Sequence, residues 1–345
     1  MKTTKVTPLI IPIFITHEGC PHRCVFCNQE PITGQHHQMG PREVGDEIRK
    51  WLRRSPAHGR KVETAFYGGS FTALPISRQR ELLQGVQPFL DSGQVQAIRL
   101  STRPDYIDSQ RADFLSSYGV ETVELGIQSM SDDVLAASKR GHSVEQSIRA
   151  INCLSASRLR VGVQLLLGLP AETMLSTLRG VRRLTAMKID FVRLYPALVI
   201  KGSGLAALYH HHKYQPLSMN QTIALTARIT SILNRHHIPV IRIGLPASKE
   251  LEDNLLAGPY HPALGEMVAA RIFFNRIRKK LRSLPKEPWQ LAISQRDRSI
   301  FYGQKKCSLQ RLQHLGLLRG GEIKFSDNNQ RGLITLRPGN MVSTP

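Results

Sequence analysis

The segment LIIPIFITHEGCPHRCVFCN, residues 9–28, joins a continuous apolar run to three closely spaced cysteines. The run Leu9–Ile15 is rich in β-branched residues, which is typical of a strand buried on both faces. Cys20, Cys24 and Cys27 follow with the spacing C-x3-C-x2-C, within a stretch short enough to form one loop. The segment therefore predicts a buried strand that leads directly into a metal or cluster site.

Similar apolar runs recur along the chain, and segments of helix length separate them. The further runs are Thr64–Tyr67, Ala97–Ser101, Thr122–Ile127, Arg160–Leu167, Phe191–Tyr195 and Val240–Gly244. The helix-length segments are Arg42–Arg54, Ser77–Leu90, Ser109–Tyr118, Ser143–Ser155, Glu172–Met187 and Met219–His236. This alternation predicts an α/β fold of βα units around a parallel sheet with helices on both faces. About six or seven such units favour a complete or partial (βα) TIM-type barrel over an open, doubly wound sheet.

A different organisation begins near residue 260, where the alternation stops. Pro262–Ser283 predicts an amphipathic helix docked on the barrel, and the two prolines within 285–288 predict a linker. Beyond the linker we expect a strand over Trp289–Ile293, a helical segment over Arg296–Leu315 and a hairpin at about 320–337.

The length and composition of the chain suit two domains, a barrel domain of residues 1–285 and a small α+β domain of residues 286–345. The 345 residues are 41% hydrophobic, so we expect an ordinary globular core and exclude disorder. No stretch approaches the roughly 20 apolar residues that a membrane helix needs. The N-terminus shows no signal-peptide cleavage site, so we expect a cytoplasmic protein with no membrane partner.

The chain carries a large excess of positive charge, because 47 Lys and Arg residues outnumber 26 Asp and Glu for a formal net charge of +21. Nucleic acid is the first candidate partner, and a generally basic, soluble surface is the alternative. From Arg271 to the C-terminus there are sixteen Lys and Arg against four Asp and Glu, a net charge of +12. The C-terminal quarter is therefore the expected docking surface for RNA.

Four basic residues of the expected helix at 262–283 are the candidates for contacts with RNA phosphates. They are Arg271, Arg278, Lys279 and Arg282. Helical spacing puts the three arginines on one face, while Phe273 and Ile277 belong to an apolar face. Such contacts position a nucleic acid but do not by themselves specify a base.

The cysteine loop has the composition of a metal or cluster site. An odd count of five cysteines, with Cys153 and Cys307 standing alone, argues against a disulfide framework. Three thiolates can bind three irons of a [4Fe–4S] cube and leave the fourth iron open. Zinc is the alternative, although its fourth ligand would then be His22, whose ring would be strained between two other ligands. Three coincidental buried thiols are a further alternative.

With Phe26 before its last cysteine, this loop after the first strand resembles that of the radical S-adenosylmethionine (SAM) superfamily. The resemblance implies that Cys20, Cys24 and Cys27 bind a [4Fe–4S] cluster whose open iron chelates SAM. It further implies that one electron from the cluster cleaves SAM to methionine and a 5′-deoxyadenosyl radical, which abstracts a substrate hydrogen. The electron would come from a donor such as flavodoxin or ferredoxin. In that family Phe26 would lie near the adenine of SAM.

A Gly-Gly pair after the second run agrees with this resemblance. Gly68 and Gly69 stand where members of the superfamily have a Gly-Gly-Glu-type motif that receives the amino group of SAM. Ser70 occupies the position of the acid, so the resemblance implies backbone contacts with SAM here.

Three residues in or after the fourth run complete the implied SAM site. Glu124 and Gln128 are polar residues in an apolar strand, and the resemblance implies contacts with the ribose or methionine of SAM. Internal hydrogen bonds within the barrel are the alternative for both. Arg140 resembles the arginine that related enzymes offer to the methionine carboxylate, and a surface arginine is the alternative.

Longer stretches narrow the resemblance to the Elongator catalytic subunit family. They are residues 17–21, 101–106, 124–142 and 193–205, and the resemblance spans about residues 8–270. Members of that family modify wobble uridine in tRNA with SAM and acetyl-CoA, so the resemblance implies an RNA-binding transferase that modifies a tRNA nucleoside. This chain is too short for their acetyltransferase domain, which puts the use of acetyl-CoA in doubt.

Lys201, Tyr260 and His261 are candidates for the reacting centre. Lys201 follows the sixth strand, while Tyr260 and His261 lie in a rigid turn between two prolines. A solvated lysine and ordinary turn residues are the alternatives. Two other functions also stay open. One is a radical SAM enzyme for a small molecule, similar to coproporphyrinogen oxidase, and the other is a non-catalytic iron–sulfur protein that binds RNA.

Overall fold

The computed structural model describes residues 7–15, 18–28, 39–283, 288–327 and 330–338. The chain forms two compact units. The first unit is Met1–Ser218 with Ile232–Tyr260, and the second is Met219–Ser231 with His261–Pro345. None of the helices in the described ranges combines the length and apolar character needed to cross a bilayer.

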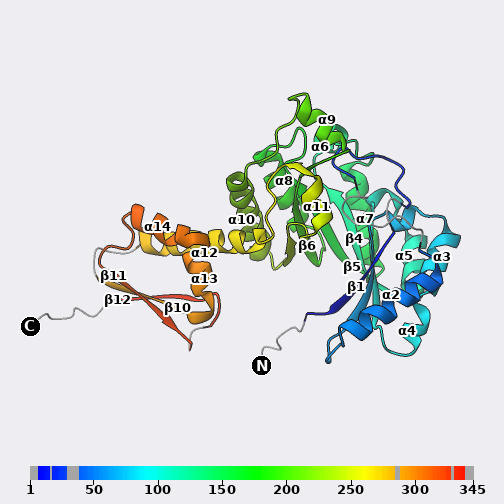
Figure 1. Ribbon diagram of the computed structural model, residues 1–345, viewed down its shortest axis with the longest axis horizontal. Coiled ribbons are helices and arrows are strands. Elements are labelled where there is room, and N and C mark those ends of the chain that lie inside the picture. The colour runs from blue at the N-terminus through cyan, green and yellow to red at the C-terminus, as the bar shows by residue number, and fades with distance from the viewer. Residues whose placement is uncertain (1–6, 16–17, 29–38, 284–287, 328–329, 339–345) are drawn as a thin grey trace, which may run out of the picture. The chain divides into compact units, whose positions relative to one another are not determined.

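Seven parallel strands form the sheet of the first unit. They are β1 (Leu9–Phe14), β2 (Val62–Tyr67), β3 (Ala97–Thr102), β4 (Val120–Gln128), β5 (Arg160–Leu167), β6 (Phe191–Pro196) and β8 (Val240–Ile243). Their spatial order follows the chain, β1-β2-β3-β4-β5-β6-β8, and every neighbouring pair is parallel. The strands curl into a half-barrel (Figure 1), which confirms the expected partial (βα) barrel.

Helices connect successive strands because a parallel pair requires a crossover. They are α2 (Pro41–Arg54), α3 (Ile76–Gln84), α4 (Gln87–Asp91), α5 (Ser109–Ser117), α6 (Asp132–Ala137), α7 (Val144–Ala156), α8 (Met174–Thr185), α9 (Gly204–His210) and α10 (Met219–Arg235). A further helix, α11 (Lys249–Asn254), follows the last strand of the sheet. Helices α2 to α5 lie along one flank of the sheet in Figure 1. A short antiparallel pair, β7 (Val199–Ile200) with β9 (Leu255–Ala257), follows β6.

The expected helix over Ser77–Leu90 is divided into α3 and α4. The division falls at Gly85, where a Cβ atom would lie 2.8 Å from the carbonyl oxygen of Pro41 at the start of α2. The glycine therefore permits a close approach to α2, and Pro88, which has no N–H to continue a helix, stands in the first turn of α4. The sequence pattern did not show this contact because its two members are far apart in the chain.

The second unit contains a three-stranded sheet and three helices of its own. They are α12 (Leu264–Arg282), β10 (Trp289–Ser294), α13 (Arg298–Tyr302), α14 (Cys307–His314), β11 (Gly321–Ser326) and β12 (Ile334–Pro338). The expected hairpin at 320–337 is wrong, because β10 lies between β11 and β12, parallel to the first and antiparallel to the second. The expected helical segment Arg296–Leu315 is interrupted around Gly303, and most of the expected linker falls outside the described residues.

The apolar face of α12 belongs to the core of this second unit. Phe273, Phe274 and Ile277 are buried together with Leu291 and Ile293 of β10. We had expected α12 to dock on the barrel and the domain boundary to fall after residue 285, but α12 instead groups with the C-terminal residues. Amphipathic periodicity identifies the buried face of a helix without identifying what covers it.

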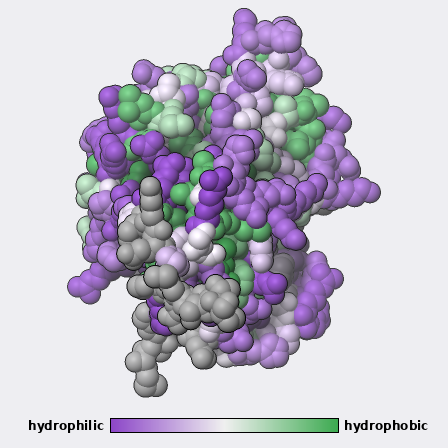
Figure 2. Space-filling view, turned by 90° about the vertical axis from the view of Figure 1, so that its left-hand side faces the viewer, coloured by the Kyte–Doolittle hydropathy of each residue, from purple (hydrophilic) through white to green (hydrophobic). Residues whose placement is uncertain are grey.

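Within the described ranges, few large hydrophobic side chains are exposed to solvent. Those that are exposed are Ile76, Met174, Leu175, Ile241, Leu315 and Leu333. Figure 2 shows hydrophilic side chains projecting over much of the face in view, with hydrophobic ones between them.

Candidate active site

A cavity of about 2300 Å³ opens within the half-barrel of the first unit. All three clustered cysteines and Phe26 line it, together with five further residues that the resemblance implied as SAM contacts. These five are Gly68, Gly69, Ser70, Gln128 and Arg140. The carboxyl ends of parallel strands meet at one edge of the sheet, which is where barrel active sites lie. The sequence therefore predicted correctly that these segments meet.

The cysteine loop is attached to four separate parts of the barrel. Val25 N donates to Ser138 O at 3.1 Å, and Leu205 N donates to Val25 O at 2.6 Å. Asn28 Nδ2 donates to Lys201 O at 2.7 Å. The side chain of Arg78 also binds both carboxylate oxygens of Glu18, at 3.0 and 3.2 Å. The loop is thus held by contacts that no short motif encodes.

The Gly-Gly pair packs directly against the cysteine loop. A Cβ atom on Gly69 would collide with Glu18 O and would lie 2.6 Å from Ile15 O. Ser70 N donates to Glu18 O at 3.0 Å, and its buried side chain lies 3.2 Å from Thr102 Oγ1. Glycine is therefore required at 69 by backbone packing, and the Ser70 hydroxyl bonds to a neighbouring strand end.

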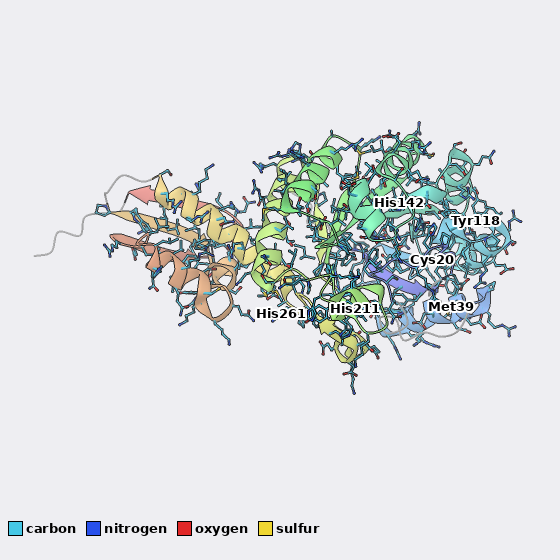
Figure 3. All side chains as sticks on the ribbon, turned by 90° about the horizontal axis from the view of Figure 1, so that it is seen from above. Cys20, Met39, Tyr118, His142, His211 and His261 are labelled. Atoms are coloured by element: carbon cyan, nitrogen blue, oxygen red, sulfur yellow. The ribbon has the colours of Figure 1, made fainter. Side chains whose placement is uncertain are left out.

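Gly141 performs a similar role on the other side of the loop. Its φ is +75°, and a Cβ atom there would lie 2.5 Å from Nε2 of His22, so the His22 ring rests on the backbone of this glycine. Figure 3 shows Cys20 in the same part of the half-barrel as His142. The imidazole of His142 is buried, and no described residue hydrogen-bonds to either ring nitrogen. Burial and the charge of Arg140 lower the pKa of His142 to about 3, so this ring is neutral.

Arg140 connects the cysteine loop to the end of β4. Its Nη1 donates to Cys24 Sγ at 3.3 Å, and its Nη2 donates to Gly126 O at 2.7 Å. Arg103 supports it by donating from Nη1 to Arg140 O at 2.6 Å while it pairs with both carboxylate oxygens of Asp105. The alternative of a surface arginine is wrong, since the side chain of Arg140 is buried.

The thiols of Cys20 and Cys27 lie in an environment that opposes their ionisation. Burial, followed by the charges of Cys24 and Cys20, raises the pKa of Cys27 to about 12. Burial is also the main cause that raises the pKa of Cys20. Among the described residues, no three His, Cys, Asp or Glu side chains converge as ligands of one metal ion. In a [4Fe–4S] cube each thiolate binds a different iron.

A polar network forms part of the cavity wall. The Glu124 carboxylate is fully buried and accepts hydrogen bonds from Arg99 (3.1 Å), Arg193 (2.9 Å), Tyr67 (3.1 Å) and Gln164 (3.0 Å). Both of its oxygens therefore accept hydrogen bonds from protein donors. This is the alternative interpretation of Glu124, in which it forms internal hydrogen bonds within the barrel.

Glu63 completes the charge balance of this network. It accepts from Nη2 and Nε of Arg99 at 2.6 and 3.0 Å, so two buried carboxylates face two arginines. Strand register explains the meeting, because Glu124 pairs with Gly162 and Gln164 pairs with Arg193 on neighbouring strands. We did not predict these arginines as site residues, although charged residues in otherwise apolar runs were a visible signal.

Gln128 ends β4 with a φ of +67°, in the left-handed region that a side chain rarely adopts. The register of β4 against β5 shifts between Leu125 and Gln128. The irregularity turns Gln128 into the cavity, where its Nε2 lies close to Gly126.

The candidates for the reacting centre lie elsewhere. Lys201 is exposed and donates from Nζ to Asp253 O at 3.1 Å, and Tyr260 donates to a carboxylate oxygen of Glu252 at 2.8 Å. Neither lines the cavity. His261 belongs to the second unit and accepts a hydrogen bond from Ala263 N at 3.0 Å.

Two family models match the chain. The model of the Radical SAM superfamily matches residues 14–179, and that of the Radical_SAM C-terminal domain matches residues 189–273. The chain belongs to the radical SAM superfamily. Its members generally use a [4Fe–4S] cluster and SAM. The expected resemblance to this superfamily is confirmed.

This radical SAM protein is 30% identical over 219 residues to an uncharacterised protein of Methanocaldococcus jannaschii, a match that covers 60% of the chain and 66% of the relative. It is 26% identical over 263 residues to the tRNA uridine(34) acetyltransferase of that organism, a match that covers 65% of the chain and 49% of the relative. Among solved structures, the archaeal Methanocaldococcus infernus Elp3 matches with a TM-score of 0.60 at 22% identity, over 79% of this chain and 63% of that chain.

The radical SAM protein thus spans about half to two thirds of the length of these curated relatives. Elongator complex protein 3 of several eukaryotes also matches, which confirms the expected resemblance to the Elongator catalytic subunit family. The Elp3 structure supports the assignment of the fold.

Proposed function

We propose that the protein is a radical SAM enzyme that modifies a nucleoside of tRNA. The observation that carries the proposal is the cysteine loop facing a cavity of about 2300 Å³ within the half-barrel. Pockets for drug-sized ligands occupy roughly 300–1000 Å³, so this cavity has room for SAM and a nucleoside together. A net charge of +21 and the match to a tRNA uridine(34) acetyltransferase support a polyanionic RNA substrate.

Cys20, Cys24 and Cys27 are the proposed ligands of the cluster. Burial, followed by the charges of the neighbouring cysteines, disfavours the thiolate form of Cys27, so this thiolate needs a bound cation to offset both costs. When bound, a [4Fe–4S] cluster supplies the electron that cleaves SAM to methionine and a 5′-deoxyadenosyl radical. The cysteines contribute the three thiolates, and the attachments of the loop fix their positions.

Arg140, Gln128 and the Gly68-Gly69 backbone are the proposed contacts for SAM. The Nε atom of Arg140 is buried and has no hydrogen-bond partner among the described residues, so it has a donor to offer a carboxylate. Gly68, with a φ of +90°, turns the chain at the cavity wall. Phe26 lines the same cavity and offers an apolar surface to the adenine.

Glu124 has a different proposed role from the one that the resemblance implied. Because protein donors occupy its carboxylate, we assign it to holding Arg99 and Arg193, which line the cavity, in fixed positions. We further propose that the electron comes from a donor such as flavodoxin or ferredoxin. We also propose that the protein acts in the cytoplasm, where tRNA is found.

Mass spectrometry of tRNA nucleosides tests the proposal. In a strain that lacks the gene, we expect one modified nucleoside to disappear. Wild-type protein and a Cys153→Ala control should restore it, whereas Cys24→Ala should not. An unchanged nucleoside profile, together with 5′-deoxyadenosine release by the reconstituted protein, would support the small-molecule alternative. Failure to release 5′-deoxyadenosine with an intact cluster would support the non-catalytic one.

A further inference from the structure

Two arginines of the second unit lie over one aromatic ring, and the charge of a third arginine is coupled to both. Arg271 and Arg278 lie on α12, and Arg311 lies on α14. The guanidinium carbons of Arg278 and Arg311 lie 5.7 and 5.2 Å from the centroid of the Phe274 ring. Phe274 is itself buried in the core of the unit, so the ring is a fixed support for both cations.

The positive charge of these arginines is not balanced by protein carboxylates. Among the described residues, no Asp or Glu forms an ion pair with Arg271, Arg278 or Arg311, and the ion pairs found in this unit use Lys324 and Arg331. Burial, followed by the charges of Arg311 and Arg278, lowers the pKa of Arg271. Like charges held together in this way favour the binding of an anion.

The arginines are also accessible, since Arg311 is exposed and Arg271 and Arg278 are half-buried. Exposed Lys305 and Lys306 immediately precede α14 and extend the positive surface. A guanidinium presents a planar fork of donors that matches the oxygens of a phosphate, whereas an ammonium acts as a point charge. Three guanidiniums without carboxylate partners therefore suit a phosphodiester backbone.

We propose that Arg271, Arg278 and Arg311 form a binding site for the phosphates of the RNA substrate. This inference rests on the proposed function. It adds Arg311, which lies on α14, to the basic residues that the sequence predicted on α12. Of the sequence candidates, Arg271 and Arg278 belong to the site, while Lys279 and Arg282 are exposed near the end of α12 and are not assigned to it. An acidic protein partner is the competing occupant.

Salt-dependent binding of the full-length protein to an unmodified tRNA transcript tests the site. Each phosphate contact contributes about 0.7–0.9 to the slope of log affinity against log salt, so the triple change R271Q/R278Q/R311Q should reduce that slope by about 2–3. At about 0.1 M salt the Kd should rise on the order of 100-fold. The reconstituted triple variant should keep the wild-type iron content, which reports on the barrel.

A matched control removes the same charge from the first unit. Arg42, Arg53 and Arg54 of α2 are exposed, and no described carboxylate pairs with them. The triple change R42Q/R53Q/R54Q should leave the slope within about one unit of wild type. An equal loss in both triple variants would show that only net charge matters and would overturn the proposed site.

Other outcomes separate this inference from the proposed function. If the wild-type protein binds tRNA with a steep salt dependence and the arginine triple binds equally tightly, the site is wrong while the proposed function stands. If the triple binds tRNA normally but loses binding to reduced flavodoxin, the surface docks an acidic protein instead. If wild-type protein binds no tRNA and the nucleoside profile is unchanged, both proposals fail.

Single variants at Arg311 keep the inference testable if the triple variant does not fold. R311Q should reduce the slope by about 0.7–0.9, while R311K should retain most of it because the charge remains. In the absence of RNA, R271Q should not lower the melting temperature, since it relieves repulsion from two neighbouring arginines. A large fall in melting temperature with unchanged RNA binding would mean that the cluster is structural and would overturn the proposal.

Discussion

The Nη1 atom of Arg140 lies 3.3 Å from the Sγ atom of Cys24, although 116 positions separate the two residues in the chain. The same guanidinium also donates to Gly126 O at 2.7 Å. One side chain therefore joins the proposed cluster loop to the end of β4. A displacement of β4 would therefore disturb the contact between Arg140 and Cys24. For this reason Arg140 is the first target for mutation.

Arg140→Met should weaken SAM binding without unfolding the protein. The change removes a buried hydrogen-bond donor from the cavity. Because a loss of about 1.4 kcal/mol of binding free energy corresponds to a tenfold rise in Kd, we expect the Kd for SAM to rise at least about tenfold. Calorimetric titration of the reconstituted protein with SAM measures it. Arg149→Met, a change at an exposed arginine of α7 that does not line the cavity, is the control and should bind as wild type does. A wild-type Kd for Arg140→Met would contradict the proposed SAM contact.

Gly69→Ala should displace the cysteine loop. The added Cβ atom would lie 2.6 Å from Ile15 O and would collide with Glu18 O, so the backbone on one side must move. We expect a loss of about 1–3 kcal/mol in the free energy of unfolding and a lower iron content after reconstitution. Gly45→Ala on α2 is the control, because its Cβ atom would meet only ordinary contacts at 3.5 and 3.6 Å. Equal iron contents in the two variants would rule out this packing role.

Glu124→Gln should destabilise the first unit strongly. It leaves the buried Arg99 and the half-buried Arg193 with one carboxylate fewer, and breaking a buried pair from one side typically costs about 3–5 kcal/mol. Urea unfolding measures the change. Glu121→Gln removes the exposed carboxylate that Lys61 contacts and should cost less than about 1 kcal/mol. Similar midpoints for both variants would show that the network contributes no more than a surface pair.

Glu172 should give the protein a distinct pH dependence of stability. Its carboxylate accepts from Gly168 N at 2.6 Å at the end of β5, and burial is the main cause that raises its pKa from 4.5 to about 7. The folded protein therefore retains a proton that the unfolded chain releases above pH 4.5. The stability that this proton contributes is fully present below pH 4.5 and is lost as the pH rises through about 7.

Urea unfolding of wild type and Glu172→Gln at about pH 5 and about pH 8 measures this contribution. At about 1.4 kcal/mol per pKa unit, the wild type should lose up to about 3 kcal/mol more than the variant over this range. Glu145→Gln, at an exposed position on α7, should behave as wild type. Parallel pH profiles for wild type and Glu172→Gln would mean that Glu172 is ionised throughout.

The strands of the half-barrel could be located from the sequence within a few residues. The expected run Arg160–Leu167 is β5 itself, and Phe191–Tyr195 is β6 without its last residue. Strands buried on both faces are continuous apolar runs, so their signal is local. The expected hairpin at 320–337 failed for the opposite reason, because the insertion of β10 between β11 and β12 is a non-local pairing.

The sequence by itself determined the order of the βα units, the cysteine loop after the first strand and the excess of positive charge. These features are written in residue types and spacings over short stretches of chain. Only the tertiary structure decided that Arg140 contacts Cys24, that Glu124 is enclosed by Arg99 and Arg193, and that Arg311 joins the arginines of α12. Each of these is a meeting of side chains from distant segments, set by strand register and helix packing, to which local periodicity is insensitive.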